Sequence, residues 1–213
     1  GKSTLLRSLT NSEAYVADEL FATVDSLQRE LPIKNVQEPL ILSDTVGFIQ
    51  NLPTTLIESF KSTLLVATSA DLLIHVVDAA TAIPQMHIGT VRNILEQINV
   101  SANEIMVFNK IDRLDRASLN DLTERYPQAL FISSLKNTGI EKLVERISSE
   151  IYGEVQQDSF LVEPKDLEKV NRFCEILEVT NSSDLLLLEI RMRSKLIHKL
   201  LDLKLMKESK NVK

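Results

Sequence analysis

Short apolar runs that alternate with helix-patterned segments constrain the fold of this chain most strongly. The run from Leu72 to Val77 is nearly continuous in apolar side chains, which is typical of a parallel strand buried on both faces of a sheet. Between such runs, apolar side chains recur at helical spacing. This alternation predicts an α/β domain with a doubly wound, mostly parallel sheet. Further strands are expected at 40–43, 105–108 and 130–132, and helices at 2–9, 53–67, 85–98 and 140–152.

The pattern changes after Tyr152, so we expect two domains, a large one at 1–152 and a small C-terminal α+β subdomain with its tail at 153–213. The lysines of its last segment could touch RNA, although the solvated face of a docked helix is the commoner reading of such a charge pattern. The expected elements are an extended segment at 160–162, a helix at 164–173, a hairpin at 175–193 and a final helix at 194–212.

Composition limits the classes of function. The net charge of -6 and pI near 5.2 argue against a protein that coats nucleic acid by bulk charge. No apolar run approaches the length that spans a bilayer, and the single cysteine, Cys174, suits a reducing compartment. We therefore expect a cytoplasmic monomer.

The first four residues, Gly1-Lys2-Ser3-Thr4, match the end of a phosphate-binding loop. Lys2 would reach the β- and γ-phosphates of a nucleotide, Ser3 would give its hydroxyl to Mg²⁺, and the helix start would offer backbone N–H groups to phosphate oxygens. A complete loop has a further glycine and hangs from a strand. We therefore expect a P-loop fold whose first strand is missing here, and weak nucleotide binding by the 213-residue chain.

A metal and γ-phosphate site is predicted downstream. Asp44 follows the strand at 40–43, where P-loop enzymes place a carboxylate that holds Mg²⁺. Gly47 would offer its N–H to the γ-phosphate. Thr23, with Phe21 beside it in the preceding loop, has the hydroxyl and backbone to touch both Mg²⁺ and the γ-phosphate. Predicted metal ligands are thus Ser3, Thr23 and Asp44, and predicted catalytic residues Lys2, Thr23 and Gly47.

The sequence Asn109-Lys110-Ile111-Asp112 follows the strand at 105–108, at the sheet edge where open α/β folds bind ligands. The Asp112 carboxylate can accept hydrogen bonds from N1–H and the exocyclic amine of guanine, donors that adenine does not present. Asn109 can bridge to N7 and the loop backbone, and the Lys110 stem can lie along the base. A mismatched base leaves buried polar groups unpaired, at about 1–3 kcal/mol each. This motif predicts guanine selectivity.

After the strand at 130–132, the residues Ser133, Ser134 and Leu135 are expected to close over the base, with the Ser134 N–H able to meet guanine O6. Two histidines, His75 and His87, lie outside the phosphate and base motifs, so packing or surface roles are favoured for both. The residues together predict a GTPase with Mg²⁺ as cofactor and GTP and GDP as substrate and product.

On these residues the chain resembles the HflX family of translational GTPases. The similar stretches are Leu20–Asp25, Asp44–Pro53 and Leu73–Asp78. The resemblance covers 1–152 strongly and the remainder loosely. It implies a GTPase that binds the ribosome, chiefly its 50S large subunit, and helps to split or rescue ribosomes. Such proteins place a further domain before the GTPase part, and the family usually has Ser-Ala where this chain has Ser133-Ser134.

Phe48 follows Gly47, a position where many GTPases carry a glutamine that orients the attacking water. Phenylalanine neither donates nor accepts hydrogen bonds, so we expect a slow intrinsic reaction that a ribosomal partner accelerates. Two alternatives stay open at this point. One is a GTPase for RNA modification or ribosome assembly, and the other is a GTP-dependent docking module that does not hydrolyse its nucleotide.

Overall fold

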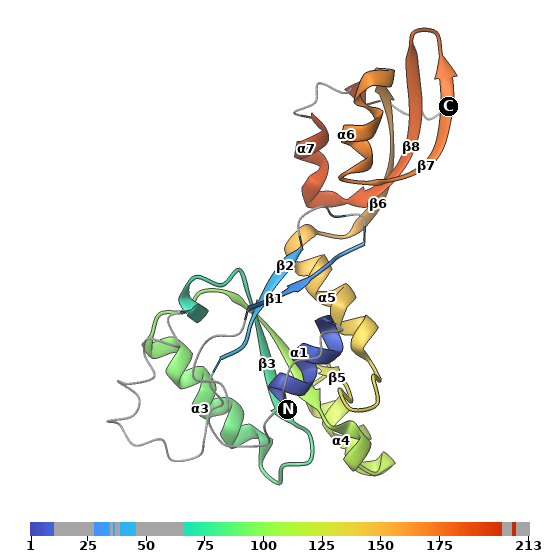
Figure 1. The fold of residues 1–213 in the computed structure, drawn as a ribbon. Coiled ribbons are helices and arrows are strands. Elements are labelled where there is room, and N and C mark those ends of the chain that lie inside the picture. The colour runs from blue at the N-terminus through green and yellow to red at the C-terminus, as the bar shows by residue number, and fades with distance from the viewer. Residues whose placement is uncertain (11–27, 35, 37–38, 46–65, 202–205, 208–213) are drawn as a thin grey trace. The chain divides into compact units, whose positions relative to one another are not determined.

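The computed structural model describes residues 1–10, 28–34, 36, 39–45, 66–201 and 206–207 (Figure 1). The chain divides into two compact units, residues 1–31 with 41–147 and residues 32–40 with 148–213. Segment 32–40 groups with the second unit, a feature that the sequence patterns did not indicate. The predicted domain boundary after Tyr152 stays a prediction. None of the described helices has the length and apolar character needed to cross a membrane.

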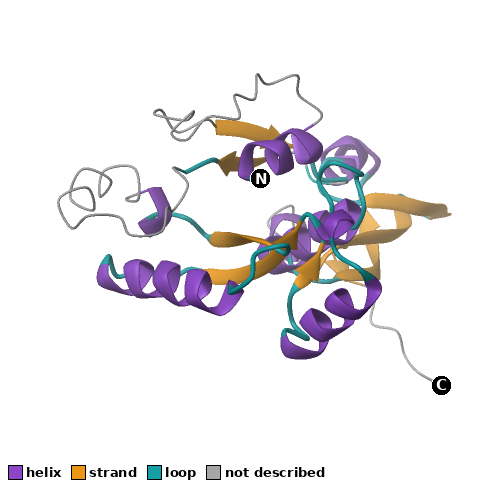
Figure 2. Cartoon of the chain, turned by 90° about the horizontal axis from the view of Figure 1, so that it is seen from below, coloured by secondary structure: helices purple, strands orange, loops and turns teal. Residues whose placement is uncertain are grey.

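A parallel three-stranded sheet organises the first unit (Figure 2). Its order is β3-β4-β5, and both neighbouring pairs run parallel. In this register Asp78 lies beside Asn109, so the carboxyl ends of β3 and β4 are level with one another. The strands are β3 (Leu72–Asp78), β4 (Asn103–Asn109) and β5 (Leu130–Phe131).

The prediction of a strand buried on both faces holds for β4 rather than for β3. Val107 and Phe108, which point to opposite faces, are fully buried, because β4 has a neighbour on each side. Most of β3 is only half-buried, since in the described part of the chain it lies at the edge of its sheet. The α/β class with a parallel sheet is confirmed.

Helices cover this sheet. Ile88 of α3 and Leu122 of α4 pack with Val77 and Phe108 in one buried cluster, so both helices lie against the same face. Helix α4 was not predicted, because Leu122 is its only buried residue and the apolar period is correspondingly weak. The helices are α3 (Pro84–Gln97), the short 3-10 helix η1 (Ile111–Arg113), α4 (Arg116–Arg125) and α5 (Ile140–Tyr152).

The amino-terminal elements of this unit are α1 (Lys2–Thr10), β1 (Gln28–Leu31) and β2 (Leu40–Ser43). The strands β1 and β2 form a separate two-stranded sheet, so the described strands within residues 1–152 make two sheets where one continuous sheet was expected. The expectation of a buried strand at 40–43 is wrong in part, since Ile41 is 56% exposed. The helix expected at 53–67 lies mostly outside the described residues.

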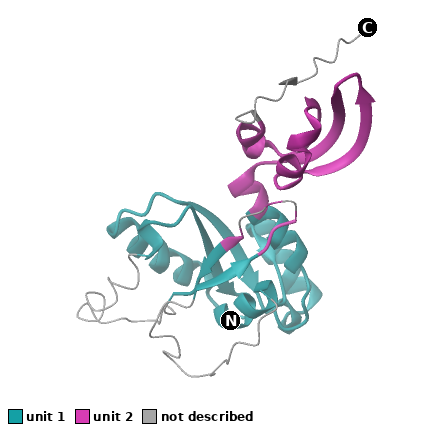
Figure 3. Cartoon of the chain, turned by 45° about the horizontal axis from the view of Figure 1, so that its top comes forward, with its two compact units in different colours: residues 1–31, 41–147 teal, residues 32–40, 148–213 magenta. Residues whose placement is uncertain are grey.

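The second unit is an antiparallel four-stranded sheet with short helices, drawn in magenta in Figure 3. The predicted hairpin is present as β7 and β8. The predicted single helix at 194–212 is wrong, because α7 ends at Leu201 and the backbone of 206–207 pairs with β6. The strands follow one another in the sheet in the order β7-β8-β6-β9. Along the chain they are β6 (Val155–Val162), β7 (Glu175–Ser182), β8 (Leu185–Arg193) and β9 (Met206–Lys207). The helices are η2 (Pro164–Asp166), α6 (Leu167–Asn171), η3 (Ser194–Leu196) and α7 (Ile197–Leu201).

The core of this unit explains its local pattern. Phe160 and Val162 of β6, Leu188 of β8, Val170 of α6 and Leu200 of α7 are fully buried in one cluster. Phe160 and Val162, two residues apart in β6, point to the same face of the sheet. The helices therefore cover one face of the sheet.

Candidate functional site

The start of α1 forms the first part of the candidate site. The Gly1 carbonyl accepts a hydrogen bond from the Leu5 N–H at 3.0 Å, and Leu5, Leu6 and Leu9 are buried on the inner side of the helix. The N–H groups at a helix start have no partner within the helix and attract anions. Burial lowers the pKa of Lys2, while the nearby Asp44 carboxylate opposes that shift. A phosphate beside this ammonium would favour its charged form.

Ser3 and Asp44 lie together. The Ser3 hydroxyl donates to Asp44 Oδ2 at 3.3 Å, and Asp44 is only 6% exposed at the end of β2. A hydroxyl and a carboxylate are hard oxygen ligands, and Mg²⁺ usually binds a few such groups together with phosphate oxygens and waters. These two residues therefore fit Mg²⁺. Among the described residues no cluster of three or more His, Cys, Asp or Glu side chains is placed to hold a metal.

Several predicted site residues lie outside the described residues. These are Phe21, Thr23 and Gly47, together with Phe48. Thr4 belongs to α1 and is half-buried. The described part of the site thus contains the predicted phosphate and base motifs and one predicted metal-binding pair.

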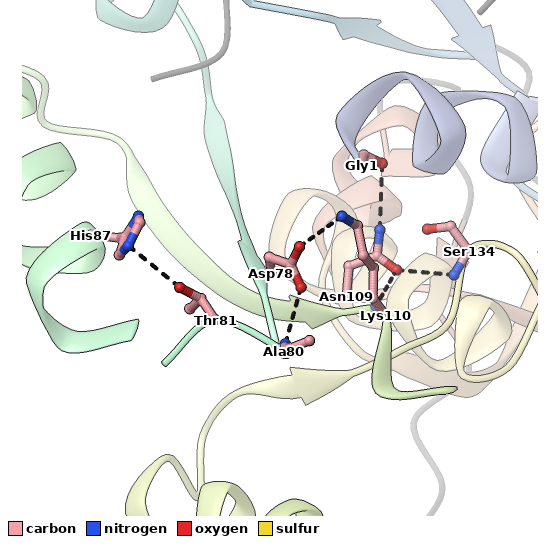
Figure 4. Close-up of polar contacts among 8 residues, drawn as sticks. All are labelled: Gly1, Asp78, Ala80, Thr81, His87, Asn109, Lys110 and Ser134. Carbon is pink, nitrogen blue, oxygen red and sulfur yellow. Dashed lines mark hydrogen bonds and ion pairs between the residues drawn. The ribbon is translucent and has the colours of Figure 1, made fainter. Parts of the chain in front are cut away.

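Asn109 connects segments that are far apart in the sequence (Figure 4). Its Oδ1 accepts hydrogen bonds from the Lys110 N–H at 2.8 Å and the Ser134 N–H at 3.0 Å. Its Nδ2 donates to the Gly1 carbonyl at 3.4 Å. At 2% exposure, this amide links the end of β4, the loop after β5 and the start of α1. An amide nitrogen has two N–H groups, so one remains after the contact with Gly1.

Ser133 orients the Asp112 carboxylate. Its hydroxyl donates to Asp112 Oδ1 at 2.5 Å and accepts the Lys136 N–H at 3.1 Å. The hydrogen bond from Ser133 lowers the pKa of Asp112. The carboxylate is therefore ionised at neutral pH, when it acts only as an acceptor. Paired donors such as those on the edge of guanine suit this group.

The loop after β5 is connected by hydrogen bonds to β4 and α1, and its contact with a base stays a prediction. The Ser134 N–H, expected to face the base, donates to Asn109, and the Ser134 carbonyl accepts from the Ser8 hydroxyl at 2.8 Å. The Leu135 side chain is 77% exposed. Sequence patterns did not point to Ser8, because a serine inside a helix carries no distinctive signal.

Lys110 has an ion-pair partner that the motif alone did not indicate. Its Nζ lies 2.6 Å from Oδ2 of Asp78, the last residue of β3. The sequence feature that could have indicated Asp78 is its position as an acidic residue directly after the apolar run of β3.

The two histidines pair outside the predicted site: His75 Nδ1 lies 2.5 Å from Glu104 Oε1, and His87 Nε2 lies 3.4 Å from Thr81 Oγ1.

Comparison with solved structures supports the fold. Era, solved in complex with MgGDPNP and part of 16S ribosomal RNA, aligns with a TM-score of 0.55 at 23% identity, over 69% of this chain and 51% of that chain. A mutational variant of SsGBP aligns with a TM-score of 0.54 at 28% identity, over 70% of this chain and 52% of that chain.

Sequence comparison is more specific. The family described as "50S ribosome-binding GTPase" matches residues 1–110. GTPase HflX of Escherichia coli K12 is 37% identical over 83% of this chain and 42% of its own length. GTPase HflX of Flavobacterium psychrophilum is 44% identical over 68% of this chain and 36% of its own length. The chain thus spans less than half of each of these two relatives. On the strength of these matches and the arrangement of its motifs, the chain belongs to the HflX family of GTPases.

Proposed function

We propose that this chain is the nucleotide-binding part of a GTPase that hydrolyses GTP to GDP and phosphate with Mg²⁺. The observation that carries the proposal is the hydrogen-bonded unit around Asn109, which joins the phosphate end of the site at Gly1 to the base loop at Ser134. One nucleotide reaching from phosphate to base would engage both ends.

The residues of the proposed site would bind different parts of the nucleotide. Lys2 and the N–H groups of α1 would hold the phosphates, and Mg²⁺, bound by Ser3 with Asp44 beside it, would neutralise the charge that develops on the transferred phosphoryl group. Asp112, held by Ser133, would accept from the two donors on the guanine edge. Thr23 and Gly47 are proposed to meet the γ-phosphate, with Phe21 beside them.

The cellular role that we propose is a switch on the ribosome. The family description names the 50S ribosome, and the sequences of HflX relatives align with most of this chain. The GTP state would bind the large subunit and help to split or rescue stalled ribosomes, and hydrolysis would release it. This role also makes the cytoplasm the proposed location.

The proposal is tested by measuring phosphate release from GTP and from ATP. The measurement uses the full-length protein, with and without large ribosomal subunits. We expect release from GTP alone, raised by the subunits. Asp112→Ala removes two charge-assisted hydrogen bonds worth about 1.5–3 kcal/mol each, so it should weaken GTP binding by 100-fold or more, as roughly 1.4 kcal/mol is tenfold.

Asp121→Asn is the matched control, because Asp121 pairs with Arg125 on the surface of α4. It should behave as the unsubstituted protein does. Equal release from ATP would contradict the base site, and a rate indifferent to subunits would contradict the ribosomal role. GTP binding without turnover under any condition would instead favour a docking module.

A further inference from the structure

The strand next to the base motif contributes a side chain to it. Asp78 ends β3, lies level with Asn109 in the parallel ladder, and approaches Lys110 Nζ with its Oδ2 at 2.6 Å. Its other oxygen accepts the Ala80 N–H at 3.0 Å. Figure 4 shows the carboxylate between these two donors. The carboxylate is therefore oriented by the main chain as well as by the lysine.

Several features set this ion pair apart from an ordinary surface pair, which contributes little. The side chains of Lys110 and Asp78 are 32% and 40% exposed. Burial alone would raise the pKa of Asp78, but the hydrogen bonds from Lys110 and Ala80 outweigh it and hold the pKa below its ordinary value. The carboxylate consequently keeps its charge throughout the neutral range.

The backbone and stem of Lys110 are also constrained. Lys110 has φ 69° and ψ 32°, in the left-handed region, which is uncommon for residues other than glycine and is found where the surrounding structure enforces it. A Cβ built on Gly1 would lie 3.8 Å from Lys110 Cε. The lysine stem therefore passes close to the start of α1, with its ammonium anchored on β3.

We infer that Asp78 is a positioning residue for guanine nucleotides: it holds the Lys110 stem in the conformation on which the base is bound. The inference rests on the proposed function and adds a residue to it. A free lysine side chain loses rotamer entropy when it is ordered, and a site already ordered before binding avoids that loss. Asp78 would thus act on affinity through Lys110 and would touch no part of the nucleotide.

A double-mutant cycle tests this. GDP affinity is measured by calorimetry for the full-length protein and for Asp78→Asn, Lys110→Met and the combined variant, with ADP as a comparison ligand. Asparagine keeps the size of Asp78 and an oxygen for the Ala80 N–H but removes the charge. We expect Asp78→Asn to weaken GDP binding roughly tenfold, the order set by the rotamer entropy of one lysine.

In the Lys110→Met background the same Asp78→Asn change should have no further effect. A tenfold loss that persists in that background would overturn the inference, because Asp78 would then act through the loop at Ala80. Unchanged GDP affinity in Asp78→Asn would overturn it too, while tight binding of GDP and not ADP by the unsubstituted protein would leave the proposed function standing. Loss of GDP binding by the unsubstituted protein would overturn both.

Thermal unfolding of each variant separates affinity from folding. Asp121→Asn, which removes a surface pair on α4, should match the unsubstituted protein in both measurements. If Asp78→Asn unfolds at a much lower temperature, the combined variant still distinguishes positioning of Lys110 from a loss of structure. A purely structural effect of Asp78→Asn on GDP affinity would appear equally in the Lys110→Met background.

Discussion

At the scale of single residues, hydrogen bonds within the protein decide what the base loop can offer to a ligand. Asn109 Oδ1 already accepts the N–H of Ser134. An oxygen of a bound base would therefore have to compete with Asn109 Oδ1 for this N–H or accept from another donor. Leu135, the next residue, is exposed, whereas Ser134 is buried. The Asp112 carboxylate, in contrast, is oriented in advance by Ser133. In the proposed guanine site, recognition by the carboxylate would therefore need less rearrangement than recognition by the loop backbone.

Cys174 supplies a prediction at this scale. Burial raises the pKa of its thiol to about 11, and the thiol donates to the Val170 carbonyl at 3.2 Å. Between pH 9 and pH 11 the unfolded chain loses this proton and the folded chain keeps it, so the free energy of unfolding should fall by up to about 3 kcal/mol across that range. Below pH 9 the contribution should be constant.

Urea unfolding at several pH values, for the unsubstituted protein and Cys174→Ala, checks this expectation. The difference between the two curves isolates the thiol, because the other titrating groups are common to both. Parallel curves from pH 8 to pH 11 would contradict a protonated, buried thiol. Alkylation by iodoacetamide at pH 8 should likewise be much slower in the folded protein than in urea.

At the scale of elements, the junction between α5 and β6 depends on one glycine. Gly153 has φ 81°, and its N–H donates to the Ser149 carbonyl at 2.9 Å, which ends the helix. A Cβ there would lie 2.1 Å from Ser194 Oγ and 3.2 Å from the Lys195 N atom. The left-handed conformation and the close approach of 194–195 both exclude a side chain.

Gly153→Ala should therefore lower the free energy of unfolding by at least about 1–2 kcal/mol, the penalty of a left-handed residue. Gly89→Ala is the opposite case, because Gly89 lies inside α3 with open space around it and alanine favours a helix by about 1 kcal/mol. Denaturant unfolding measures both. Adding Ser194→Ala to Gly153→Ala should recover only the steric part, and a neutral Gly153→Ala would refute this account of the junction.

At the scale of the whole molecule, hydrolysis is expected to depend on the ribosome. Phe48 cannot orient a water molecule by hydrogen bonding, so single-turnover GTP hydrolysis by the isolated full-length protein should be slower than with large subunits by roughly two orders of magnitude or more, within the range that partner proteins supply to GTPases. Phe48→Leu, which is equally unable to hydrogen-bond, should keep the slow intrinsic rate. An isolated protein as fast as the stimulated one would rule out this dependence.

Local patterns in the sequence were sufficient for most elements and for the chemistry of the motifs. The helices at α1, α3 and α5, the strands of the parallel sheet and the β7–β8 hairpin follow from apolar spacing, which is a property of neighbouring residues. The same holds for the motif at 109–112, which predicts guanine selectivity. The sequence by itself thus determined the α/β class and the kind of ligand to expect.

Only the tertiary structure decided the features that depend on partners distant in the chain. Which strand is buried on both faces depends on its neighbours in the sheet, so β4 and not β3 has that place. The backbone of 206–207 pairs with β6, a long-range contact that overrides the helical spacing of that segment. Asp78 meets Lys110 because parallel pairing sets the ends of β3 and β4 level. A sequence pattern records which residues are apolar or charged, but the register between strands is fixed only when they pack.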